Sequence, residues 1–179
     1  LANEIRTPGD WAERVGAEPS GWCFEYANRF YPDVDDTAMV VIALATWRAA
    51  EAASGARRGA ADAAISRAVG WLTAMQNADG GWGAFDRDND SEFLCKVPFA
   101  DHNAMIDPSS PDLAGRVLEA FGKVGLRIGH RAVDRGVDYL RRSQEDAGGW
   151  YGRWGVNYIY GTWQVLEGLD RKSTRLNSS

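Results

Sequence analysis

The stretch Gln76-Asn77-Ala78-Asp79-Gly80-Gly81-Trp82 decides the fold, because its pattern of Gln, Gly and Trp returns at positions 144, 148 and 150, each 68 residues later. Similar segments precede the two copies, at residues 67–72 and 135–140. Repeated helix pairs cannot bury their apolar faces alone, so they stack into a solenoid or a closed ring. The Gln can bond backbone groups at a helix end, and the Trp can pack across the turn. We therefore expect structural roles for Gln76, Trp82, Gln144 and Trp150.

Helical signals run along the chain on both sides of this stretch. Ser110-Pro111 is a cap followed by a first-turn proline, in the preferred order. Thr37–Ala53 is apolar nearly all round, which is typical of a buried helix. No alternating strand pattern is present, so the predicted fold is all-α. The predicted helices are a short one at 11–15 and longer ones at 37–53, 60–75, 110–124, 131–142 and 159–169.

Composition narrows the class of protein. The chain has 179 residues, a formal net charge of −5 and no basic run, which argues against nucleic-acid binding. No apolar run is long enough to span a membrane. Cys23 and Cys95 lack metal-like spacing and predict reduced thiols, and the isolated His102 and His130 argue against zinc.

Length and patterning predict one domain over residues 1–170. Residues 171–179 are polar and without periodicity, and we interpret them as a non-native or frayed tail. Because the chain begins at Leu1 without a clear first element, we expect a fragment of a longer protein.

A cluster of acids precedes the first long helix. Asp33, Asp35 and Asp36 lie within four positions, after Pro32 and before Thr37. Three neighbouring carboxyls cannot all ionise cheaply, so one proton should remain among them. A helix N-terminus also stabilises the anion that remains after a proton is donated. This pattern indicates a carboxylic acid that is kept protonated and ready to donate its proton.

The two Gln–Gly–Trp repeats and the acid motif Asp-x-Asp-Asp-Thr-Ala together resemble the squalene–hopene cyclases, the bacterial triterpene cyclases. Residues 31–38, 80–86 and 152–162 extend the resemblance, which covers about residues 20–170. It implies a central piece of a larger protein, forming part of one α/α barrel, a partial toroid. It also implies cyclisation of squalene to hopene- or hopanol-type pentacyclic triterpenes through carbocations.

The resemblance assigns roles to the acids and to one cation. Asp35 matches the proton donor, and Asp33 and Asp36 match the acids that tune it. Arg116 stands where the family has a cationic side chain, often His, beside the donor. Asp112, four residues earlier on the same helix face, is predicted to hold Arg116. A plain surface pair of Asp112 and Arg116 is the alternative.

The resemblance also implies a substrate cavity with aromatic walls, because aromatic faces stabilise a carbocation without reacting with it. Phe85 replaces a Tyr that some relatives carry. No cofactor or metal is implied, and the cytoplasmic face of the bacterial membrane is the expected location, with peripheral contact to lipid. A homodimer is left open. The residues that match the cavity lining are Phe24, Phe85, Trp154 and Tyr160, with Phe99 near the substrate entrance.

Several other interpretations remain. Residues 86–92 mimic a calcium loop but have Ser91 at the sixth position and Val97 at the twelfth, where Gly and Glu are needed. A class II diterpene cyclase shares the acid motif but needs a basic pocket for a diphosphate. A non-catalytic helical-repeat module, or an inactive fragment, is also consistent with the repeats.

Overall fold

A computed structural model describes residues 1–24, 28, 30–52, 59–90 and 106–170. Within these ranges the chain is helical, and its only β pairing consists of isolated bridges, Trp22 with Asp33 and Asn89 with Asp107. The prediction of an all-α fold is therefore confirmed for the described residues. The helices are α1 (Asp10–Val15), α2 (Val34–Ala52), α3 (Gly59–Ala74), α4 (Pro111–Val124), α5 (Arg131–Arg142) and α6 (Asn157–Leu169).

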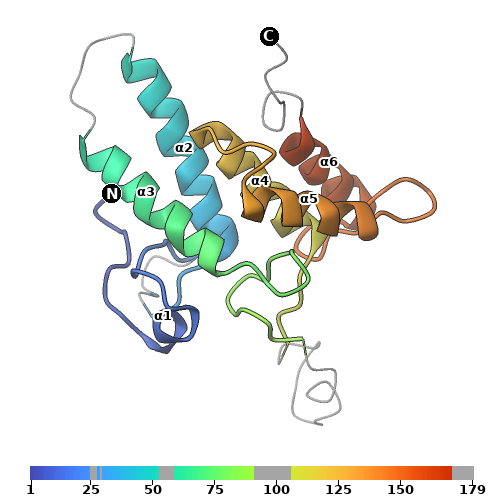
Figure 1. Ribbon diagram of the computed structural model, residues 1–179, viewed down its shortest axis with the longest axis horizontal. Helices are drawn as coiled ribbons and strands as arrows, with labels where there is room; N and C mark the ends of the chain where they lie inside the picture. The colour runs from blue at the N-terminus through green and yellow to red at the C-terminus, as the bar shows by residue number, and fades with distance from the viewer. Residues whose placement is uncertain (25–27, 29, 53–58, 91–105, 171–179) are drawn as a thin grey trace.

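The long helices form two layers (Figure 1). In one layer α4 packs between α2 and α6. In the other layer α3 packs on α2 and α4, and α5 packs on α4. Between the layers lies a core of large side chains, in which the Trp82 ring meets the Phe121 ring edge-on at 6.0 Å between centroids. The layers thus alternate along the chain, with α2, α4 and α6 in one and α3 and α5 in the other.

The predicted helix bounds agree with the structure, with one exception that matters. The first long helix begins at Val34 rather than at Thr37, so Asp35 and Asp36 lie inside its first turn. Its expected burial all round is also wrong, because Met39 and Trp47 are 47% and 45% exposed. Only one face of α2 is buried in the described structure, and it consists of Val34, Thr37, Ala38, Val41 and Ala45.

The first Gln–Gly–Trp turn joins α3 to the core. Gln76 donates from Nε2 to the carbonyl oxygens of Gly80 and Ala132, both at 2.9 Å. Trp82 donates from Nε1 to the Leu72 carbonyl oxygen at 2.7 Å. The Gln therefore closes its own turn and also ties it to α5, while the Trp ties the turn back to α3.

The second turn repeats two of these bonds 68 residues later. Gln144 donates to the Gly148 carbonyl oxygen at 2.9 Å, and Trp150 donates to the Leu140 carbonyl oxygen at 2.7 Å. Each turn is thus closed by a matching pair of hydrogen bonds, one from its Gln and one from its Trp.

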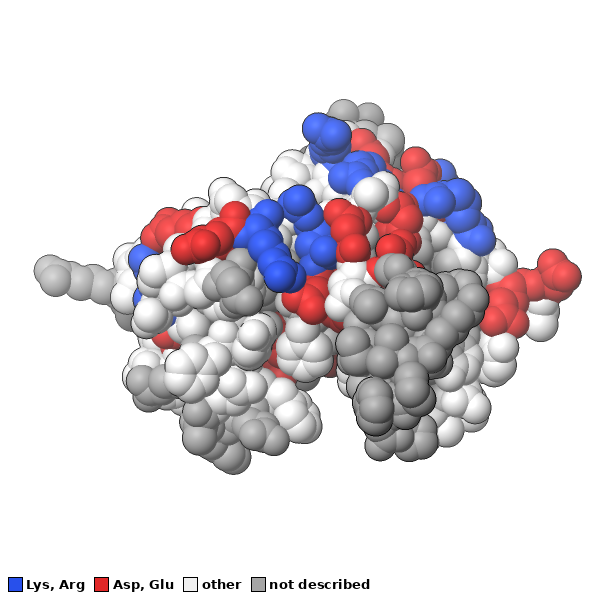
Figure 2. All heavy atoms as spheres, turned by 90° about the horizontal axis from the view of Figure 1, so that it is seen from below, with Lys and Arg blue, Asp and Glu red and all other residues white. Residues whose placement is uncertain are grey.

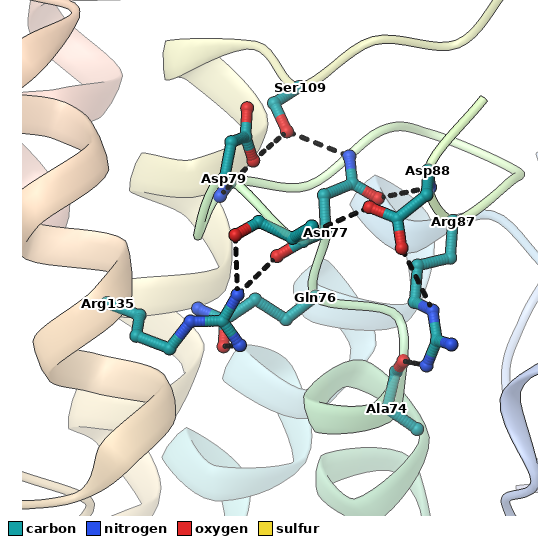
Figure 3. Close-up of polar contacts among 10 residues, drawn as sticks. Ala74, Gln76, Asn77, Asp79, Arg87, Asp88, Ser109 and Arg135 are labelled. Carbon is teal, nitrogen blue, oxygen red and sulfur yellow. Dashed lines mark hydrogen bonds and ion pairs between the residues drawn. The ribbon is translucent and has the colours of Figure 1, made fainter. Parts of the chain in front are cut away.

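A polar network surrounds the first turn (Figure 3). Arg135 of α5 donates from Nη2 to the carbonyl oxygens of Asn77 and Ala78, at 2.7 and 3.0 Å. The Asn77 side chain donates to Ser109 Oγ at 2.8 Å, and Ser109 Oγ donates to Asp79 at 2.8 Å. Since these polar groups satisfy one another, we assign the network a structural role.

Among the described residues on the face seen in Figure 2, charged side chains gather mainly in the upper half of the view. There, Lys and Arg are interspersed with Asp and Glu, so the described residues of this face form no basic stripe of the kind that binds nucleic acid. None of the described helices has the length and apolar character needed to cross a bilayer.

Candidate active site

The acid cluster is fixed at the start of α2. Asp33 caps the helix: its Oδ1 accepts the backbone N–H of Asp36 at 2.9 Å, and its own carbonyl oxygen accepts that of Thr37 at 3.0 Å. The N–H of Val34 donates to the carbonyl oxygen of Ala84 at 2.8 Å. Thr37 lies inside the first turn of the helix, and its hydroxyl accepts the backbone N–H of Trp22 at 2.9 Å.

All three acids favour the protonated state more than a free carboxyl does. Burial raises the pKa of Asp33 to about 7, and the negative charges of Asp36 and Asp35 act in the same direction. Burial also raises the pKa of Asp35, against the opposing effect of Arg116. The pKa of Asp36 is raised by burial and by Asp35. The cluster can therefore hold a proton near neutral pH.

Asp35 forms an ion pair across two helices. Arg116 of α4 donates from Nε to Asp35 Oδ1 at 3.0 Å, and the Arg116 side chain is only 11% exposed. Its Nη2 donates to the hydroxyl of Tyr160 in α6 at 3.2 Å. Because an Arg stays charged, it stabilises the carboxylate that Asp35 becomes after it gives up a proton. Burial thus raises the pKa of Asp35, while Arg116 provides a fixed partner for its anion.

The predicted support of Arg116 by Asp112 is not formed. Asp112 is buried, and its two oxygens accept the backbone N–H groups of Leu113 at 3.1 Å and Trp154 at 2.9 Å. Arg116 instead turns toward Asp35 and Tyr160. The reason is that the backbone of the 150–156 segment competes for the Asp112 carboxylate. Asp112 and Arg116 therefore form neither a surface ion pair nor the predicted supporting contact. Asp112 instead fixes the backbone of Trp154.

A cavity of about 400 Å³ opens beside these groups. The Phe85 and Trp154 rings in its wall meet edge-on at 6.3 Å between centroids. Phe24 lies at the rim and is 80% exposed. Phe99 is outside the described residues. The cavity is lined by Phe24, Asp33, Asp35, Asp36, Met39, Ala84, Phe85, Leu113, Arg116, Trp154 and Tyr160.

Three lining residues and one neighbour of the cation were missed from the sequence. Met39 and Leu113 could have been found from helical spacing, since they lie four residues after Asp35 and three before Arg116. Ala84 precedes Phe85 and carried no separate signal. Trp163 also escaped notice, and its ring centroid lies 6.0 Å from the Arg116 guanidinium carbon. These residues make the cavity more apolar around a single ion pair.

No group of three or more His, Cys, Asp or Glu side chains suited to a metal ion occurs in the described part of the chain. In the calcium-like stretch, Asp88 Oδ1 accepts the backbone N–H of Ala78 at 2.6 Å, and Asp86 Oδ2 accepts the Asn89 side-chain N–H at 3.1 Å. These acids thus have bonding partners within the protein. Ser91 and Val97 lie outside the described residues.

Asp33→Asn is expected to flatten the pH dependence of stability. The folded state keeps a proton on Asp33 up to about pH 7, whereas the unfolded chain loses it near its ordinary pKa. The free energy of unfolding therefore falls as pH rises through this window, by about 1.4 kcal/mol per pH unit at most. We expect the free energy of unfolding of the wild type to fall by about 2–3 kcal/mol more than that of the variant between pH 5 and 7. Urea unfolding of the full-length protein at pH 5, 6 and 7 measures it.

Asp138→Asn on α5 is the control for this experiment, because the Asp138 side chain is 65% exposed and, among the described residues, its carboxylate pairs only with Arg141. The control should retain the wild-type pH dependence. Equal slopes for wild type and Asp33→Asn would contradict the assignment of a raised pKa to Asp33.

Comparison with known proteins finds one family. The sequence profile of the squalene-hopene cyclase C-terminal domain matches residues 1–178. A squalene-hopene cyclase from Schizosaccharomyces japonicus is 43% identical over 163 residues, which cover 90% of this chain and 24% of that protein. The squalene–hopene cyclase of Alicyclobacillus acidocaldarius is 44% identical over 170 residues, 94% of this chain and 26% of that protein. The enfumafungin synthase of Hormonema carpetanum is 39% identical over 173 residues, 90% of this chain and 13% of that protein.

The chain thus spans about a quarter of the length of the squalene-hopene cyclases it matches. The match to the domain profile covers nearly all of the 179 residues. This chain belongs to the squalene-hopene cyclase C-terminal domain family.

Proposed function

We propose that the protein that contains this chain cyclises squalene to hopene- or hopanol-type triterpenes, and that Asp35 starts the reaction by protonating a terminal alkene. The observation that carries the proposal is the Asp35–Arg116 ion pair, which lies in the wall of an aromatic cavity. An alkene is a very weak base, so its protonation needs an acid whose anion is stabilised in a dry site. Arg116 supplies that stabilisation, and Asp33 and Asp36 supply a shared proton.

The aromatic rings serve the second half of the reaction. After protonation the positive charge moves along the carbon skeleton of squalene as its rings close. The faces of Phe85, Trp154 and Tyr160 can stabilise this charge. Loss of a proton from the last cation gives an isomer of squalene, whereas capture of water followed by loss of a proton gives an alcohol.

The arrangement of the helices also supports the proposal, although it is less specific than the site. Two alternating helical layers with matched turns are what an arc of an α/α barrel would show, and we propose that this chain forms such an arc. The cavity is open here, since the Trp154 side of its wall is half exposed. We infer that other parts of the full-length protein complete the wall and exclude water.

Product analysis of the full-length protein tests the proposal. Squalene incubated with the enzyme in D₂O should give a pentacyclic product that carries one solvent deuteron, because Asp35 exchanges its proton with solvent before it donates. Mass spectrometry detects both the product and the added deuteron. A cyclic product without deuterium would contradict proton initiation. Turnover of a diterpenyl diphosphate but not squalene would favour a class II diterpene cyclase, although Arg116 is the only Lys or Arg among the described residues of the cavity wall.

A further inference from the structure

A buried carboxylate outside the acid cluster, that of Asp107, binds the backbone of the turn at residues 84–86. Asp107 is 6% exposed and lies before α4. Its Oδ1 accepts the backbone N–H of Ala84 at 2.9 Å, and its Oδ2 accepts those of Phe85 at 2.5 Å and Asp86 at 2.8 Å. Three consecutive N–H groups thus converge on one side chain. Hydrogen bonds to a carboxylate are stronger than those between neutral groups, so they fix this turn firmly.

The turn held by Asp107 reaches the site at two points. The carbonyl oxygen of Ala84 accepts the N–H of Val34, which lies between Asp33 and Asp35. The next residue, Phe85, places its ring against Trp154 in the cavity wall. One peptide segment therefore touches both the acids and an aromatic face.

Asp107 is itself fixed from two sides. Its backbone N–H donates to the Asn89 carbonyl oxygen at 2.7 Å, and Arg153 donates to the carbonyl oxygen of the preceding Ile106 at 3.3 Å. Gly83 allows the close approach, because a Cβ at that position would lie 2.7 Å from Asp107 Oδ2 and would also meet the Asp107 carbonyl oxygen. The Asp107 carboxylate and the backbone at Gly83 thus pack closely together. A side chain at residue 83 would disturb the bonds from Asp107 to the 84–86 turn.

We propose that Asp107 is a positioning residue for cyclisation: its carboxylate clamps the 84–86 turn and so sets the place of the Phe85 ring relative to the acids at the start of α2. This inference rests on the proposed function. A shift of about 1 Å at a reacting centre can cost a factor of about 100 in rate. A displaced ring also leaves a cation without its stabilising face. Such a cation loses a proton early to give a partly cyclised isomer of squalene, or it takes up water to give a partly cyclised alcohol.

Asp107→Asn in the full-length protein tests the proposal. Asn offers one acceptor oxygen but turns an N–H₂ group toward the amides that Oδ2 now binds, so the turn should loosen. We expect kcat per folded molecule to fall about 10- to 100-fold with a smaller change in KM, and the share of partly cyclised products to rise. Gly83→Ala perturbs the same contact from the other side and should shift the products in the same direction. Asp138→Asn is the matched control and should leave rate and products unchanged.

A double variant separates positioning from a general loss of stability. If Asp107 acts through Phe85, then Asp107→Asn should add little to the product change already caused by Phe85→Ala, so the two effects should not multiply. Multiplying effects, or wild-type kcat and products in folded Asp107→Asn, would overturn the proposal.

Hydrogen exchange separates this proposal from the proposed function. In Asp107→Asn, amide exchange at residues 84–86 should speed up, while α5 keeps its wild-type protection. If the wild type makes no cyclic product from squalene but the exchange rises as expected, the proposed function fails and the clamp stands. If exchange at 84–86 stays at the wild-type rate in folded Asp107→Asn, the clamp is overturned whatever the activity.

Discussion

Asp35→Asn is expected to lower the rate of squalene cyclisation by about 1000-fold or more, to the limit of detection. The variant keeps the shape of the side chain and an oxygen that can accept from Arg116 Nε, so the contact now formed at 3.0 Å can persist. It removes the proton that begins the reaction, and general acid catalysis typically contributes about 10²–10⁴-fold. The cyclic product is quantified by mass spectrometry against a standard, at matched concentrations of folded enzyme.

The control for this prediction is again Asp138→Asn, an acid-to-amide change on the exposed face of α5, which should retain wild-type turnover. Thermal unfolding of both variants checks that they are folded. Turnover by Asp35→Asn within tenfold of the wild type would reject Asp35 as the proton donor. The next candidate would then be Asp33, whose pKa is raised to about 7.

The site is assembled where the layer of α2, α4 and α6 brings three helix starts together. Asp35 lies in the first turn of α2, Tyr160 lies in the first turn of α6, and Arg116 lies in the second turn of α4. Helix N-termini carry partial positive charge, so their convergence favours the ionised form of Asp35. The fold therefore contributes to the acid strength of Asp35 in addition to the direct bond from Arg116.

Local patterns allowed much of this to be predicted. The Gln–Gly–Trp repeat predicts the bonds that close each turn, because their acceptors lie within a few residues or at the end of the preceding helix, as with Gln76 and Gly80. The bond from Gln76 to the Ala132 carbonyl oxygen is long-range and was not predicted in this way. Helix bounds followed from proline, glycine and cap residues for the same reason. The exception at α2 arose because Asp33 itself is the cap, which starts the helix at Val34.

Long-range partners could not be predicted in this way. Spacing along a helix favoured a bond between Asp112 and Arg116, yet each found its partner in a distant segment. Asp107 carried no local signal, because the amides it binds lie more than 20 residues earlier. The exposure of Met39 and Trp47 also depends on what packs beside α2, and an apolar pattern does not reveal that. Sequence reasoning named the acids and the rings as candidates, but it did not predict the contacts that orient them.

The close crossing of α4 and α6 leads to the second large prediction, which is that Gly168→Ala and Gly168→Val destabilise the protein strongly. A Cβ on Gly168 would meet the carbonyl oxygen of Gly115, and that group is backbone and cannot turn aside. Overpacking typically costs about 1–3 kcal/mol, and the branched Val should cost more than Ala.

Gly70→Ala in α3 is the matched control, since a Cβ there has open space and Ala favours the helix by about 0.5–1 kcal/mol. Urea unfolding of the full-length protein should therefore give opposite signs for the two glycine-to-alanine changes. A stabilising Gly168→Ala would mean that α4 and α6 do not approach this closely. Because Arg116 adjoins Gly115 and Tyr160 lies on α6, a destabilised crossing should also weaken the bond between the cation and the Tyr160 hydroxyl.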